Sequence, residues 1–143
     1  MHIPLGCLVI LYFLSVSCQT RNGGKTDPIT SRINLPSGFH IEKYAEGVKG
    51  AREMTLGENN TIFVGTRGGQ VFALEDKNLD YKVDNVLVIA SGLNSPNGVA
   101  FKNGDLYVGE IHRIIKFEDI ENQLDNIPKP IIIFDEYPDK SHH

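Results

Sequence analysis

The residues best suited to chemistry in this chain are histidines and carboxylates that stand beside short apolar runs. His142 and His143 form an adjacent pair near the end of the sequence, and Glu110 and His112 follow an earlier run. Imidazole titrates close to neutral pH, which suits it to acid–base catalysis. Neighbouring side chains diverge on an extended backbone, so the histidine pair is a poor metal site by itself. Catalysis, a weak metal site and a loop edge stay open for this pair, and Glu110 with His112 is either a site pair or a rim.

A second polar group, at 75–85, has the oxygen spacing of a calcium-binding loop. Oxygen-bearing side chains occupy relative positions 1, 3, 5 and 9 of that loop, namely Asp76, Asn78, Asp80 and Asp84. A calcium loop of the EF-hand type also needs glycine at its sharp turn and a bidentate glutamate at its end. Tyr81 and Leu87 occupy those two places. The sequence therefore favours a polar hairpin loop here, and no metal site is predicted.

Three further polar residues stand in segments that favour turns. Arg67 precedes Gly68 and Gly69, and its guanidinium is either an anion ligand or a solvated turn residue, the reading we favour. Asn94 and Asn97 flank Pro96. Asparagine and proline form turns without any ligand, so these residues predict a turn before they predict a site.

Short apolar runs separated by Gly, Asn, Asp and Pro fill the chain from Phe39 onward. Val, Ile, Phe and Tyr are prominent in these runs, a pattern typical of β-strands. The predicted strands are 39–44, 53–56, 61–65, 70–75, 86–90, 98–101, 105–109, 113–118 and 131–135. One segment, 118–124, has helical spacing, and the prolines at 128 and 130 limit the predicted helix to about two turns.

The strand pattern repeats along the chain. The alignments are 44–54 with 89–99 at a shift of 45, 61–65 with 105–109 at a shift of 44, and 86–90 with 131–135 at a shift of 45. Four short strands in a repeat of about 45 residues match one blade of a β-propeller. The sequence therefore predicts an all-β fold, a partial β-propeller whose two four-stranded blades lie at 53–90 and 98–135.

Two blades do not close a ring, because propellers protect their strand edges by repeating at least four blades around an axis. We therefore expect the chain to be the N-terminal part of a longer protein. The run at 39–44 supports this expectation, since it stands at a fourth-strand position one period before 86–90. In a closed ring such a strand completes the last blade.

The same blade topology predicts where a ligand site forms. Loops between the second and third strands, and loops that lead into the next blade, open on one face of a propeller. In this chain those loops are 66–69, 91–97, 110–112 and 136–143. The candidate residues Arg67, Asn94, Glu110, His112 and His142 are therefore expected at a common face.

The N-terminal residues predict export. Residues 1–17 contain no Lys, Arg, Asp or Glu. Their apolar run from Leu5 to Leu14 is too short for a membrane-spanning helix of about 20 residues and is typical of a signal peptide. Small residues lead to Cys18, and the polar segment 18–33 predicts a flexible tether. This order resembles a bacterial lipoprotein signal, in which the acylated Cys18 anchors a periplasmic protein to the membrane; a plain signal peptide cut nearby is the alternative.

Composition fits one globular domain and argues against a nucleic-acid partner. The chain has 143 residues, a formal net charge of −4, 41% hydrophobic residues and two cysteines. Charges of both signs are interspersed without a Lys/Arg cluster, so a nucleic-acid partner is not expected. Cys7 leaves with the signal peptide, so no disulfide is predicted within the mature chain.

The strings LPSGFHIEKYAEGVKGAREMTLGENNTIFVGTRGGQVFAL, SGLNSPNGVAFKNGDLYVGEIHRIIKFEDIENQLDN and PDKSHH together resemble the glucose/sorbosone dehydrogenase family. The resemblance covers 34–143. It implies the N-terminal part of a six-bladed propeller that oxidises sugars or sugar-derived aldehydes. It also implies pyrroloquinoline quinone (PQQ) and calcium as cofactors, and an external electron acceptor.

The resemblance further implies a role for the terminal histidines. His142 corresponds to the general base that takes a proton from the sugar hydroxyl, with His143 as the reserve choice. The PQQ and calcium ligands of the family have no counterpart in this chain, so the chain is expected to be inactive alone. Pro96 replaces the Gln of glucose-oxidising members. The alternative is a non-catalytic propeller that serves as a binding module on a lipoprotein anchor, because fold alone does not decide function.

Overall fold

The structure, a computed structural model, describes residues 29–139. These residues belong to two compact units, divided between His40 and Ile41. In the described part of the first unit, the 3₁₀ helix η1 (Thr30–Arg32) is the regular element. No helix within 29–139 has the length and apolar character needed to cross a membrane.

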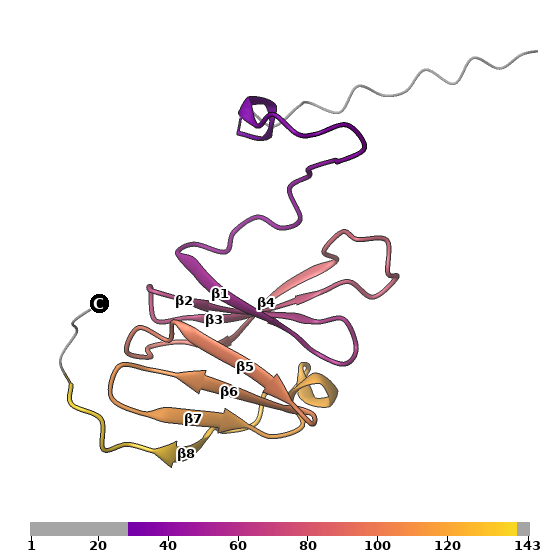
Figure 1. Cartoon of the computed structure of the whole chain (residues 1–143). Coiled ribbons are helices and arrows are strands. Elements are labelled where there is room, and N and C mark those ends of the chain that lie inside the picture. The colour runs from indigo at the N-terminus through magenta and orange to yellow at the C-terminus, as the bar shows by residue number, and fades with distance from the viewer. Residues whose placement is uncertain (1–28, 140–143) are drawn as a thin grey trace, which may run out of the picture. The chain divides into compact units, whose positions relative to one another are not determined.

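The second unit contains two four-stranded antiparallel sheets, stacked face to face (Figure 1). The first sheet consists of β1 (Ala51–Leu56), β2 (Ile62–Thr66), β3 (Val71–Glu75) and β4 (Asn85–Ala90). The second sheet consists of β5 (Gly98–Lys102), β6 (Asp105–Gly109), β7 (Ile114–Phe117) and β8 (Ile131–Phe134). In both sheets the strand order follows the chain order. The predicted all-β fold with two four-stranded units is confirmed.

Two predicted elements differ from the described structure, and one of them, the strand at 39–44, is expected to pair with strands outside this chain. Residues 39–44 form no strand in the structure. Every described strand pairs within one of the two sheets. A run with strand composition becomes a strand only when a neighbour pairs with it, and neither sheet extends to this run. The predicted helix at 118–124 is only a 3₁₀ helix, η2 (Ile120–Gln123). Asp119 adopts a left-handed φ of 46°, which separates η2 from the strand before it and prevents a longer helix.

The main core lies between the two sheets. Side chains alternate across a strand, so one face of β2 and β3 turns Phe63, Val71 and Ala73 toward the second sheet. The Phe63 ring stacks on Phe101 of β5 with ring centroids 5.7 Å apart. The backbone N–H of Phe101 also donates to the Thr55 hydroxyl, at 3.2 Å. The other buried members of this core are Ile89, Val99, Leu106, Val108, Ile115, Phe117 and Ile120.

A smaller cluster covers the opposite face of the first sheet. Val64, Phe72 and Leu74 are buried there. The partly buried residues packed on them are Tyr44, Ala45, Val48, Ile62 and Val83. The first sheet therefore has apolar side chains on both faces, which is unusual for an antiparallel sheet with one solvated side.

Candidate functional site

Four loops meet at one end of the stacked sheets. Backbone hydrogen bonds join them in a row: Leu93 N–H donates to Gly69 O at 3.1 Å, Ile111 N–H to Asn94 O at 3.1 Å, and Tyr137 N–H to His112 O at 3.2 Å. These bonds link the loops 66–69, 91–97 and 110–112 and the described part of 136–143. The loops predicted to share a face are therefore neighbours in the structure.

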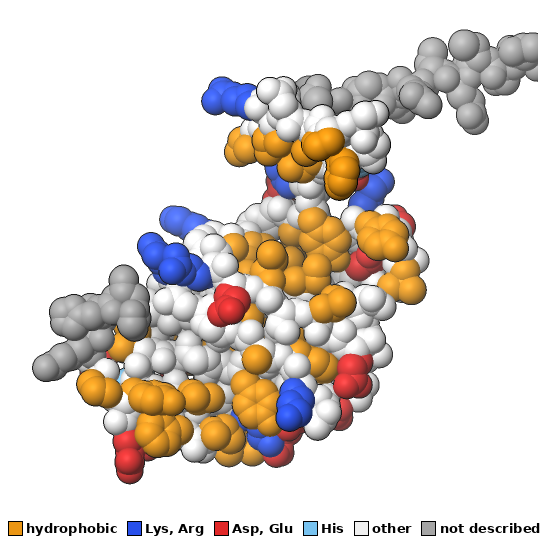
Figure 2. Space-filling view, in the orientation of Figure 1, with side chains coloured by type: hydrophobic (Ala, Val, Ile, Leu, Met, Phe, Trp, Pro, Cys, Tyr) orange, Lys and Arg blue, Asp and Glu red, His pale blue; other side chains and the backbone are white. Residues whose placement is uncertain are grey.

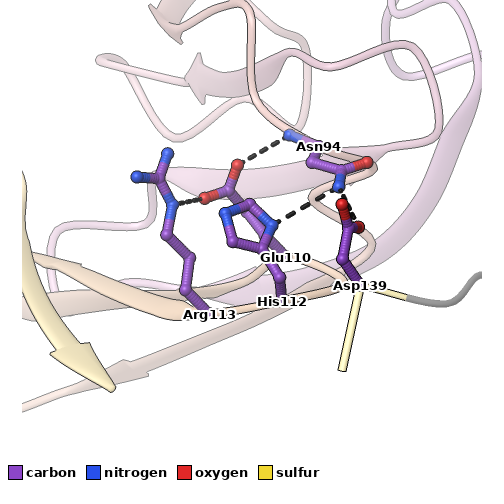
Figure 3. Close-up of polar contacts among 5 residues, drawn as sticks. All are labelled: Asn94, Glu110, His112, Arg113 and Asp139. Carbon is purple, nitrogen blue, oxygen red and sulfur yellow. Dashed lines mark hydrogen bonds and ion pairs between the residues drawn. The ribbon is translucent and has the colours of Figure 1, made fainter. Parts of the chain in front are cut away.

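Five polar side chains gather in this row of loops, and we call them the rim cluster. Figure 3 shows its members, Asn94, Glu110, His112, Arg113 and Asp139. They come from the segment before β5, from the β6–β7 loop and from the segment after β8. The cluster therefore forms only when these three segments meet.

Glu110 is the buried centre of the rim cluster. Its side chain is fully buried beside Arg113, whose Nε donates to one carboxylate oxygen. The other oxygen accepts the backbone N–H of Asn94 at 2.6 Å. The hydrogen bond to Glu110 raises the pKa of Arg113 above its ordinary value. Both carboxylate oxygens thus have donors, and Glu110 serves to position the loops rather than to accept a substrate proton.

The Asn94 side chain connects the two more exposed members of the cluster. Its Nδ2 donates to Asp139 Oδ1 at 3.1 Å and lies 3.4 Å from His112 Nδ1. That second contact is a hydrogen bond when Nδ1 carries no proton, which leaves the Nε2 proton as the donor of the ring. His112 is half-buried. Asn94 can therefore orient an imidazole whose far nitrogen is available for a ligand.

The remaining candidate residues from the sequence, Arg67 and Asn97, lie in turns outside the rim cluster. Arg67 is exposed in its turn and its backbone N–H donates to Gly50 O at 3.2 Å. Asn97 lies before β5, and its Oδ1 is buried without a hydrogen-bond partner. Within residues 29–139, the hydrogen bonds and ion pair of the rim cluster involve neither of these two side chains.

The segment at 75–85 forms the hairpin connection between β3 and β4, as predicted. Its oxygens accept backbone donors of the loop itself. Asp76 accepts the N–H groups of Asp80 at 3.2 Å and Tyr81 at 2.9 Å, and Asp84 accepts that of Lys77 at 2.8 Å. No metal-binding group of three His, Cys, Asp or Glu occurs within 29–139. The loop is therefore closed by its own carboxylates.

The residues with the most specific sequence assignments, His142, His143 and Cys18, lie outside the described residues. Sequence reasoning placed Glu110, His112 and Asn94 correctly at one end of the sheets, but it did not single out Arg113 or Asp139. Arg113 could have been found from its spacing, because it follows Glu110 by three residues in a tight loop, where two such side chains lie on the same side and can pair.

The described residues do not by themselves fit PQQ or calcium. PQQ is a tricarboxylate and needs cationic side chains, yet the cation of the rim cluster, Arg113, is already paired with buried Glu110. Calcium takes 6–8 oxygen ligands, usually with several carboxylates among them, and no group of three His, Cys, Asp or Glu that could hold a metal occurs in the described part of the chain.

Comparison with known proteins gives no match: no family model, no curated protein and no solved structure matches the chain.

Proposed function

We propose that this chain is the N-terminal part of a propeller-type, PQQ- and calcium-dependent dehydrogenase that oxidises sugars or sugar-derived aldehydes. The observation that supports the proposal best is the arrangement of the loops. The strings that resemble the glucose/sorbosone dehydrogenase family include the loops 91–97 and 110–113, which carry four of the five residues of the rim cluster. These loops meet at one end of two stacked four-stranded sheets.

The rim cluster supports the proposal through its position in the chain. The segment after β8 is tied to the cluster by the contact of Asp139 with Asn94 and of Tyr137 with His112. In the proposal, His142 lies close beyond that segment and accepts the proton of the sugar hydroxyl. The cofactors are held by residues of the complete protein that lie outside this chain.

The proposal is tested by dye-linked oxidation of aldoses by the protein expressed from the complete reading frame, supplied with PQQ and calcium. We expect turnover, and we expect His142→Ala to lower kcat by about 10²- to 10⁴-fold, the usual contribution of a positioned base. PQQ binding should change little, because the base acts mainly in the transition state.

The neighbouring histidine supplies the matched control. On an extended backbone His143 points away from the group that His142 faces, so His143→Ala should have a much smaller effect on kcat. A larger effect of His143→Ala would shift the assignment by one residue. An active protein in which neither change slows the chemical step would remove the catalytic assignment, and an inactive complete protein would favour the non-catalytic binding module.

A further inference from the structure

The rim cluster fixes which nitrogen of His112 carries the ring proton. The Asp139 carboxylate only accepts hydrogen bonds, so the atom of Asn94 that faces it at 3.1 Å is the amide Nδ2. The same Nδ2 lies 3.4 Å from His112 Nδ1, and it has two N–H groups, one for each partner. Nδ1 is therefore the acceptor, and the proton of the neutral imidazole is on Nε2. Asp139, acting through Asn94, sets the tautomer of His112.

Three polar atoms of these residues remain open for a ligand. Within residues 29–139, His112 Nε2, Asn94 Oδ1 and Asp139 Oδ2 make no hydrogen bond. The atoms of His112 and Asn94 are not buried, and Asp139 is an exposed residue. Figure 3 shows the three side chains turned toward one another from separate segments. Together they present one donor and two acceptors to solvent.

The backbone below these atoms is already fixed. Glu110, whose side chain is fully buried, binds both Arg113 and the backbone N–H of Asn94. The N–H of Tyr137 donates to His112 O at 3.2 Å, which ties the segment after β8 to the same loop. Groups that are held in place before a ligand arrives lose little conformational freedom on binding. The rim cluster is therefore preorganised.

Exposed aromatic side chains lie beside the loop that carries His112. The ring centroids of Phe134 and Tyr137 are 4.5 Å apart, and these residues are 39% and 46% exposed. Figure 2 shows hydrophobic side chains gathered over β8, the strand that contains Phe134. Ligand sites commonly combine aromatic surface with a few placed polar groups. The aromatic pair and the rim cluster together supply both.

We propose that the rim cluster binds a neutral polyhydroxyl ligand. A hydroxyl group both donates and accepts, so one hydroxyl oxygen accepts the Nε2 proton of His112, and neighbouring hydroxyls donate to Asn94 Oδ1 and Asp139 Oδ2. The Asp139 carboxylate repels an anion. Arg113 does not offset this repulsion, because Glu110 already pairs with it. The site therefore favours neutral sugars over sugar acids and sugar phosphates.

As a substrate subsite, this assignment rests on the proposed function, in which the complete protein oxidises sugars. It adds to that function a sugar-binding site within the described residues and a preference for neutral substrates. Binding at the rim cluster requires neither PQQ nor turnover. It can therefore be measured apart from the enzyme activity.

The test is the affinity of the protein from the complete reading frame for sugars without PQQ, measured by ligand-observed NMR. The neutral probes are glucose, galactose and xylose, and the anionic probes are gluconate and glucose 6-phosphate. We expect saturable binding of a neutral probe and weaker binding of the anions. His112→Asn lacks a donor at the Nε2 position and should weaken neutral binding by about 3- to 10-fold, the effect of one lost hydrogen bond. His112→Gln, whose longer amide reaches that position, should retain most of the affinity.

Asp139→Asn separates recognition of the ligand from a structural role. The new amide oxygen still accepts Asn94 Nδ2, so binding of the neutral probe should change little. Gluconate should bind more tightly, because the repelling charge is gone. Asp125→Asn is the matched control and should change neither affinity, since Asp125 is also exposed but follows η2, at the other end of β7 (Figure 1).

The outcomes separate this proposal from the proposed function. Folded protein that binds no neutral probe would overturn the subsite, and so would equal affinities of wild type, His112→Asn and His112→Gln. Oxidation of aldoses by a protein whose sugar affinity is unchanged in His112→Asn would overturn the subsite and leave the dehydrogenase standing. Sugar binding that depends on His112 in a protein that oxidises no aldose would support the subsite and overturn the dehydrogenase.

Discussion

At the scale of single residues, the stacking of the two sheets depends on a glycine. Gly65 lies near the end of β2, an inner strand of the first sheet, where the carbonyl oxygens of Pro96 and Asn97 would lie 2.5 and 2.6 Å from a built Cβ. Any side chain at this position would push the loop 91–97 away from the sheet. That loop carries Asn94, so Gly65 also positions the rim cluster.

We therefore expect Gly65→Ala to destabilise the fold by about 1–3 kcal/mol, the usual cost of overpacking a well-packed core. Urea unfolding of the wild-type chain and of the variant measures this difference. Gly109→Ala is the matched control, because its Cβ meets only ordinary contacts at 3.8 Å. Equal midpoints for the two alanine variants would contradict the packing account.

The sequence predicted part of the site at this scale. Asn94, Glu110 and His112 were candidates because polar residues in loops at one end of a repeat converge. Which of them is buried could not be predicted, since the burial of Glu110 depends on Arg113 folding back over it and on the Asn94 backbone reaching it. Those contacts come from the packing of two loops far apart in the sequence.

At the scale of elements, ion pairs of Lys116 with Asp105 and Glu118 link the two strands of the β6–β7 hairpin. Lys116 lies between Asp105 and Glu118, and Asp105 also accepts the backbone N–H of Asp119 at 3.1 Å. The hydrogen bond from Lys116, followed by that from Asp119, lowers the pKa of Asp105 below its ordinary value. The hydrogen bonds that Lys116 donates to Glu118 and to Asp105 raise the pKa of Lys116 above its ordinary value.

This network predicts a defined dependence of stability on pH. Because the folded pKa of Asp105 is lower than its unfolded value of about 3.9, its ionised form stabilises the fold above about pH 4. The stabilisation is lost as the pH falls through the lowered value. The melting temperature of wild-type protein should therefore fall more steeply with acidification below about pH 4 than that of Asp105→Asn. Parallel curves for the two proteins would contradict this prediction, because they would show that folding does not lower the pKa of Asp105.

The strands were the elements that the sequence predicted best, because alternating apolar residues bounded by turn residues fix both their type and their approximate ends. The run at 39–44 has the same composition and still forms no described strand, since pairing is a long-range property. The helix over 118–124 failed for a local reason. Asp119 is left-handed because it lies in the turn that joins β7 to η2. The spacing of apolar residues, on which the helix prediction was based, does not predict such a turn.

At the scale of the whole molecule, the repeat explains the two stacked four-stranded sheets. The main core lies between them, and a smaller buried cluster covers the other face of the first sheet. The number of sheets in a closed propeller depends on the rotation between neighbouring sheets, which the pattern of residues within one repeat does not specify. The sequence could therefore predict the repeat, while the closed propeller remains part of the proposed function.

The predicted lipid anchor at Cys18 concerns where the whole molecule is located. If Cys18 is acylated, Cys18→Ala should move the exported protein from the membrane fraction to the soluble fraction, because several acyl chains anchor firmly where one holds only marginally. Cys7→Ala is the control and should leave fractionation unchanged, since Cys7 is removed with the signal peptide. Membrane association of a correctly processed Cys18→Ala protein would contradict the lipoprotein assignment.

The central claim is that the complete protein is a quinoprotein, and a titration with PQQ tests it most directly. PQQ is added to the purified protein from the complete reading frame, with calcium present or removed by a chelator, and bound quinone is followed by its absorbance. The account predicts saturable binding that requires calcium, whether or not a sugar substrate has been identified. Absence of binding to the folded protein in the presence of calcium would contradict it.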